Sequence, residues 1–159
     1  MQPTVEYMIL IPVLILQIFL FPMIVSAVMG QWVGDRQTLE LQQTASSLGS
    51  VIEQTYLSLN HTSILSCKFN STLPFAPTIE GYNFTATATL HAVSNTDYGA
   101  CKVLDVTLSL VGKQLSTSTE VTLGQNVQWI NSELVGNPPT ACLLAQKLAN
   151  QTIQLEFGS

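Results

Sequence analysis

The sequence predicts an α+β fold in which a long N-terminal hydrophobic α-helix is followed by an antiparallel β domain. Three observations predict this fold: an uncharged apolar run over residues 7–33, apolar residues at helical spacing over residues 41–59, and an apolar period of two from about residue 60. The β domain is expected to be an Ig-like β-sandwich or a small β-barrel. We therefore predict two domains, an N-terminal helix over residues 1–60 and a β-rich globular domain over residues 61–159.

The first element is an apolar helix. Residues 7–33 read YMILIPVLILQIFLFPMIVSAVMGQWV and contain no charged side chain. Because about 20 apolar residues cross a bilayer as a helix, this run is long enough to span a membrane. A cleavable secretory signal would have a basic segment before a shorter apolar core, a pattern that this run does not follow. A plain membrane anchor gives no role to Glu6, whose carboxylate is costly there unless it lies at the membrane interface or meets a partner.

The helix is expected to continue well beyond the apolar run. Apolar residues recur every three or four positions and form one stripe of an α-helix, namely Leu41, Ala45, Leu48, Ile52, Tyr56 and Leu59. No proline occurs between Trp32 and Asn60, so one helix is predicted from about Pro3 to about Leu59. Its length would be ~85 Å, because an α-helix rises about 1.5 Å per residue.

Two prolines and two glycines are candidate packing positions in the apolar half of this helix. Pro12 and Pro22 each remove a backbone donor, so each is expected to bend the helix or to be accommodated by neighbouring helices. Ser26, Gly30 and Gly34 follow one another at steps of four residues. Such a ridge of small residues allows two helices to approach closely in apolar surroundings. The alternative interpretation is that these three small residues occur at this spacing by chance.

The β domain is predicted from the alternation of apolar and polar residues. Strands are expected over residues 82–90, 104–110, 121–123, 127–129 and 153–157. Turn-forming residues separate them, at positions 74–77, 95–99, 112, 124–126 and 136–139. For residues 140–150 a short helix is the expected alternative to a strand.

Three cysteines, Cys67, Cys101 and Cys142, permit at most one disulfide within the chain. An extracellular location would favour oxidation. Pairing of Cys101 with Cys142 and pairing of Cys67 with Cys101 are both open, and the remaining thiol is expected to be buried. The chain has no CxxC, and His61 and His91 lie outside any metal-ligand spacing, so no metal site is predicted.

Four Asn-x-Ser/Thr sequons are candidates for N-glycosylation, with the acceptors Asn60, Asn70, Asn83 and Asn150. All four lie outside the apolar helix, and glycans there would solvate a surface poor in charge. Asn83 alternates with Tyr82 and Phe84, which favours exposure of its side chain. For each site the alternative is an unmodified surface amide.

The composition excludes several classes of function. Charged residues make up only 9% of the chain, against about 25% in typical soluble domains, while 47% of residues are hydrophobic. The five basic residues are scattered, so no basic patch is expected to neutralise a nucleic acid. No hydrolase, nucleotide-binding or metalloprotease motif occurs. We therefore expect the chain to be neither an enzyme nor a cofactor-binding protein.

The segment QPTVEYMILIPVLILQIFLFPMIV, from Gln2 to Val25, resembles the N-terminus of archaeal type IV pilins. In that family a class III signal is followed by a Gln-x-x-x-Glu-Tyr pattern and a hydrophobic run, and Gln2, Glu6 and Tyr7 match this pattern. The shorter segment VEYMILIPVLIL is also similar to Tad-type minor pilins, and archaellins share the architecture. The resemblance covers roughly the first 60 residues, and it implies a mature N-terminus at Met1 or Gln2.

The resemblance implies a structural subunit of an extracellular filament that polymerises through its N-terminal helix, with adhesion as the usual purpose. Glu6 would pair with the N-terminal amine of a neighbouring subunit, and Tyr7, Pro12, Pro22, Gly30 and Gly34 would complete the assembly helix. The implied partners are further copies of the chain, the cytoplasmic membrane before assembly, a prepilin peptidase and the pilus assembly machinery. The alternative is a membrane-anchored cell-surface binding module with an Ig-like domain.

Overall fold

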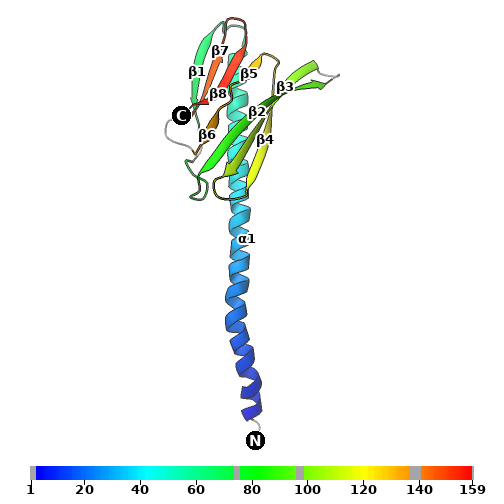
Figure 1. Ribbon diagram of the computed structural model, residues 1–159, viewed down its shortest axis with the longest axis vertical. Coiled ribbons are helices and arrows are strands. Elements are labelled where there is room, and N and C mark those ends of the chain that lie inside the picture. The colour runs from blue at the N-terminus through cyan, green and yellow to red at the C-terminus, as the bar shows by residue number, and fades with distance from the viewer. Residues whose placement is uncertain (1–2, 74–75, 96–98, 137–140, 159) are drawn as a thin grey trace. The chain divides into compact units, whose positions relative to one another are not determined.

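The structure, a computed structural model, describes residues 3–73, 76–95, 99–136 and 141–158, with side chains for all of these except residues 3–7, 9, 94, 95 and 99. Over this part of the chain one long helix is followed by strands arranged in two sheets, which confirms the predicted α+β fold class (Figure 1). The elements are α1 (Pro3–Leu59), β1 (Cys67–Thr72), β2 (Phe84–Asn95), β3 (Gly99–Leu110), β4 (Ser116–Leu123), β5 (Val127–Trp129), β6 (Glu133–Val135), β7 (Cys142–Lys147) and β8 (Ile153–Gly158).

The chain forms two compact units, residues 1–37 and residues 38–159. The boundary between them lies inside α1, because the apolar stripe that begins at Leu41 is buried with the strands whereas residues 10–33 are exposed. The sequence-based division at residue 60 follows the change from helix to strand instead. The second unit therefore contains residues 38–59 of α1 together with the strands.

The predicted helical stripe of the second unit is confirmed. Its six residues are all buried, from fully buried Leu41, Leu48 and Ile52 to Tyr56, which is 7% exposed. Burying the apolar side of an amphipathic helix against a sheet is the main source of its stability in a protein. Gly49 lies on this side of α1, where an added Cβ would contact Thr119 and Val121 of β4 at 3.3 Å, so the helix backbone packs close to that strand.

The strands form two four-stranded sheets. The first sheet has the order β1-β7-β8-β5 and the second sheet has the order β4-β3-β2-β6. Neighbouring strands are antiparallel except β5 and β8, which are parallel. Figure 1 shows the two sheets on either side of the cyan part of α1. The core lies between these layers and includes Leu104 and Leu108 from the second sheet and Leu143 and Leu155 from the first.

The strand predictions are confirmed where apolar alternation is clear, but the short helix over residues 140–150 is wrong. Residues 142–147 form β7, which pairs with β1 on one side and β8 on the other. Leu143 and Ala145 of this central strand point into the core and are almost fully buried. Cross-strand hydrogen bonding and burial therefore override the helical propensity of alanine, leucine, glutamine and lysine in this segment.

The end of α1 is held by a contact network centred on Asn126. The Tyr56 hydroxyl donates to Asn126 Oδ1 at 3.3 Å, and Asn126 Nδ2 donates to Asn60 Oδ1 at 3.0 Å and to the Gln151 carbonyl oxygen at 3.1 Å. We call these four residues the Asn126 network. It joins the last turn of α1 to the segments before β5 and β8. Gly124 makes room for it, because an added Cβ there would overlap the Tyr56 hydroxyl oxygen.

Gly124→Ala is expected to destabilise the second unit by about 1–3 kcal/mol, since forcing a methyl group into a packed site displaces its neighbours. The atom in the way is the Tyr56 hydroxyl oxygen, so the double variant Gly124→Ala/Tyr56→Phe is expected to recover part of this loss. Urea unfolding of the full chain in mild detergent measures both effects. Equal stability of the single and double variants would show that the Tyr56 hydroxyl is not the source of the destabilisation.

Candidate functional site

The largest exposed apolar surface belongs to the first part of α1. Between residues 10 and 33 every side chain is exposed, and the large hydrophobic ones range from 38% exposed for Val25 to 73% for Phe19. The exposed side chains surround the helix, because every position of each turn is included. Soluble monomers rarely leave more than a few hundred Å² of contiguous apolar surface uncovered. This surface, which we call the apolar helix surface (residues 10–33), is of the kind that lipid or other protein chains cover.

By length and composition, α1 can cross a membrane, and none of its apolar window is buried within the chain. A core helix of a soluble protein of the same composition would be mostly buried. The exposed state of these residues therefore distinguishes α1 from such a helix and makes it compatible with a membrane anchor.

The predicted assembly residues lie along this helix. The side chains of Glu6 and Tyr7 are outside the described residues. Pro12 and Pro22 both occur inside α1, which continues through them, and Pro22 lies beside a shallow groove of about 610 Å³ that Leu14, Gln17 and Phe21 also line.

The small residues of the helix leave room beside it. Apart from the chain neighbours and the adjacent backbone of α1 itself, an added Cβ at Gly30 or Gly34 would meet no atom of the described residues within 4 Å. Both positions can therefore accommodate the close approach of another helix.

The four sequon asparagines are all exposed, and they lie in different local structures. Asn60 immediately follows α1, Asn70 lies within β1, Asn83 precedes β2, and Asn150 lies between β7 and β8. The predicted exposure of Asn83 next to buried Phe84 is confirmed. Each acceptor is thus accessible to solvent, but the backbone around it differs.

The three cysteines are unpaired thiols in the structure. Cys67 and Cys142 lie at opposite ends of the β1–β7 ladder, where Cys67 faces Lys147 and Cys142 faces Thr72. Five residues of a strand cover about 17 Å, whereas a disulfide needs Cα atoms about 4.4–6.8 Å apart. This fold therefore rules out the pair Cys67–Cys142. Cys101 lies in the second sheet, and Cys142 is the buried thiol.

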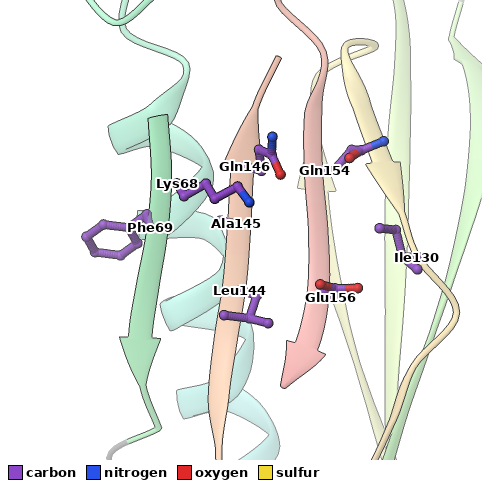
Figure 2. A pocket seen from close by; sticks show the side chains of 8 residues that line it. All are labelled: Lys68, Phe69, Ile130, Leu144, Ala145, Gln146, Gln154 and Glu156. Atoms are coloured by element: carbon purple, nitrogen blue, oxygen red, sulfur yellow. The ribbon is translucent and has the colours of Figure 1, made fainter. Parts of the chain in front are cut away.

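A shallow hollow of about 210 Å³ lies on the face of the first sheet turned away from α1 (Figure 2). Four strand or strand-flanking segments line it, with Lys68, Phe69, Ile130, Leu144, Ala145, Gln146, Gln154 and Glu156. The Phe69 ring points away from the hollow toward the outer side of β1 (Figure 2). The lining contains hydrogen-bonding amides and two charged groups but no Ser, Cys or His that could serve as a nucleophile or base. Sequence reasoning did not find this hollow, because its residues are distant in the chain and form no motif.

Two polar contacts of the second unit were also not predicted. His91 Nδ1 lies 3.4 Å from Asp105 Oδ2 on the outer face of the second sheet, and exposed pairs of this kind contribute little stability. Lys147 is buried among apolar residues, and its ammonium group donates to the His61 carbonyl oxygen at 3.1 Å. Among the described residues, no three His, Cys, Asp or Glu side chains are grouped so that they could hold a metal ion.

Comparison with known proteins gives no match, since no protein-family model, curated protein or solved structure is significantly similar to this chain. The function must therefore be inferred from the apolar helix surface and from the domain that follows it.

Proposed function

We propose that the chain is a structural subunit of an extracellular filament like the archaeal type IV pilus, and that it polymerises through the first part of α1. The apolar helix surface carries this proposal. Such a surface is stable only in lipid or within a bundle of similar helices. A filament subunit uses both environments in turn, lipid of the cytoplasmic membrane before assembly and the helices of neighbouring copies afterwards.

The second part of α1 supports the same proposal. It contributes the buried stripe from Leu41 to Leu59 to the core of the second unit, so the β domain cannot separate from the helix without losing its own core. Each polymerising helix therefore brings one β domain with it. Head-to-tail contacts whose rotation does not close generate an open helical polymer, with the polar β domains toward solvent.

The resemblance of residues 2–25 to archaeal type IV pilins adds the remaining parts of the proposal. A prepilin peptidase and the pilus assembly machinery are the proposed processing and assembly partners, and adhesion is the proposed purpose. The chain itself is proposed to have no catalytic activity and no cofactor.

A membrane-anchored binding module is the second candidate. The length of α1 and the hollow of Figure 2 favour it, since an anchored domain with a recessed polar surface would bind a ligand at the cell surface. In this case the apolar helix surface would stay in lipid, and no polymer would form.

Negative-stain microscopy of material sheared from the surface of producing cells tests the proposal. We expect helical filaments in which mass spectrometry of the purified fibres identifies this chain as the main component. Membranes from the same cells serve as the control for unassembled subunits. If the chain occurs only in membranes, with no fibres that contain it, the membrane-anchored module is correct and the filament is not.

A further inference from the structure

The four sequons fall into two structural groups. Asn60-His61-Thr62 follows the end of α1, and Asn150-Gln151-Thr152 forms the loop between β7 and β8, so both are turns. Asn70-Ser71-Thr72 lies entirely within β1, and Asn83-Phe84-Thr85 enters β2. Because acceptor asparagines of N-glycosylation occupy surface loops, the first group is the better substrate.

Both turn sequons hold the acceptor side chain by its oxygen. Asn60 Oδ1 accepts a hydrogen bond from Asn126 Nδ2 at 3.0 Å, and Asn150 Oδ1 accepts one from the backbone N–H of Thr152 at 3.1 Å. The second bond makes an Asx turn inside the sequon itself. Among the described residues, neither acceptor Nδ2 has a hydrogen-bond partner. N-glycosylation forms its bond at Nδ2 and leaves Oδ1 a carbonyl oxygen, so both orienting hydrogen bonds survive the modification.

The two strand sequons, at Asn70 and Asn83, are held in or beside a sheet instead of a turn. Phe84, the middle residue of one, is fully buried, and the hydroxyl group of Thr85 is 2.6 Å from that of Ser109. In the other, Asn70 and Thr72 face Leu144 and Cys142 across the β1–β7 ladder. In each of these sequons the asparagine and the threonine lie on one face of an extended segment that is held or led into a sheet by its ladder, so the segment would have to leave the sheet to form a turn like those at Asn60 and Asn150.

The two turn sequons are neighbours in the fold. Asn126 Nδ2 bonds both the Asn60 side chain and the Gln151 carbonyl oxygen, so one side chain contacts both sequons. Figure 1 shows the end of α1 and the β7–β8 loop at the same end of the second unit. His61, Thr62 and Gln151 are exposed, so this end has room for two glycans.

We propose that Asn60 and Asn150 are the N-glycosylated residues, that together they form one glycan-bearing end of the β domain, and that Asn70 and Asn83 stay unmodified. The donor is a lipid-linked oligosaccharide phosphate. The bond between sugar C1 and the phosphate oxygen breaks, C1 bonds to Nδ2, the amide loses one proton, and the lipid phosphate leaves with the electron pair. The inference rests on the proposed function in one respect, the location of the β domain outside the cell.

Mass spectrometry of glycopeptides from the full chain, purified from the cells that naturally produce it, tests the inference. We expect glycans on Asn60 and Asn150 in most copies and none on Asn70 or Asn83. Thr62→Ala and Thr152→Ala each remove one sequon but keep the asparagine, and Thr152→Ala also keeps the backbone N–H of the Asx turn. Each of these variants should lose the mass of one glycan, whereas the matched variant Thr72→Ala should lose none.

The outcomes separate this inference from the filament proposal. Modification of Asn70 or Asn83, or unmodified Asn60 and Asn150, overturns the inference even if filaments form. Glycans at Asn60 and Asn150 on a chain that forms no filaments support the inference and reject the filament.

Discussion

Replacing Glu6 by alanine is expected to prevent filament formation while the β domain remains folded. Glu6 is the only acidic or basic residue between Met1 and Gly34. Among packed apolar helices a carboxylate is tolerated only if it meets a partner, for which we propose the N-terminal amine of a neighbouring subunit. Removing one member of a buried ion pair costs about 3–5 kcal/mol, which weakens association by about 100-fold or more. The yield of fibres sheared from cells, relative to chain in the membrane, measures this loss.

Glu53→Ala is the matched control for this variant. It removes a carboxylate from an exposed position of the same helix and changes the net charge equally, so fibre yield should stay normal. Glu6→Asp, which keeps the charge on a shorter side chain, should retain part of the yield. Circular dichroism of the membrane-extracted variants verifies that the β domain is folded. Normal fibres from Glu6→Ala would show that this carboxylate has no part in assembly.

The long helix was predictable because its two signals are local in the sequence. An uncharged run and a stripe of apolar residues at steps of three and four predict one helix from about Pro3 to Leu59, and α1 has these bounds. The sequence also predicts which side of the second part of α1 is buried. All six residues of the predicted stripe lie in the core. Neither signal requires knowledge of what the helix packs against.

The missed strands have a different cause. β1 is an edge strand of mostly exposed residues, and β6 has only three residues, so neither shows apolar alternation. In β7 the inward positions are Leu143, Ala145 and Lys147, and the buried lysine interrupts the expected pattern. Lysine is seldom buried without a partner, and its partner here, the His61 carbonyl oxygen, is 86 residues away in the chain. The parallel pairing of β5 with β8 likewise depends on tertiary contacts that no local pattern encodes.

The candidate sites likewise divide into those that a local sequence pattern encodes and those that depend on tertiary contacts. The sequons were visible as short motifs, but their ranking required the turn at Asn150 and the contact of Asn60 with Asn126, and Asn126 belongs to no motif. The hollow of Figure 2 combines residues from positions 68 to 156, so no sequence window contains it. By contrast, the apolar helix surface is contiguous in sequence, and the structure adds that its side chains remain exposed.

Ile52→Ala is expected to destabilise the second unit by about 2–5 kcal/mol, because it removes three carbons from a fully buried position where α1 meets the core. Natural domains are stable by about 5–15 kcal/mol, so this loss would unfold a large fraction of molecules under mild denaturing conditions. Urea unfolding of the full chain in mild detergent, followed by tryptophan fluorescence, measures it. Trp129 reports on the core, since its ring lies edge-to-face against Phe157 with the centroids 4.9 Å apart.

Leu57→Ala is the matched control, because Leu57 lies on the same part of α1 but is 59% exposed. Its effect should be within about 0.5 kcal/mol. Equal destabilisation by the two variants would show that burial of the stripe is not the source of the loss; helix propensity cannot be its source either, because alanine is the better helix former at both positions. A large loss for Ile52→Ala alone would mean that the β domain depends on α1 for its core. Any process that moves the apolar helix surface from lipid into a fibre must then carry the β domain with it.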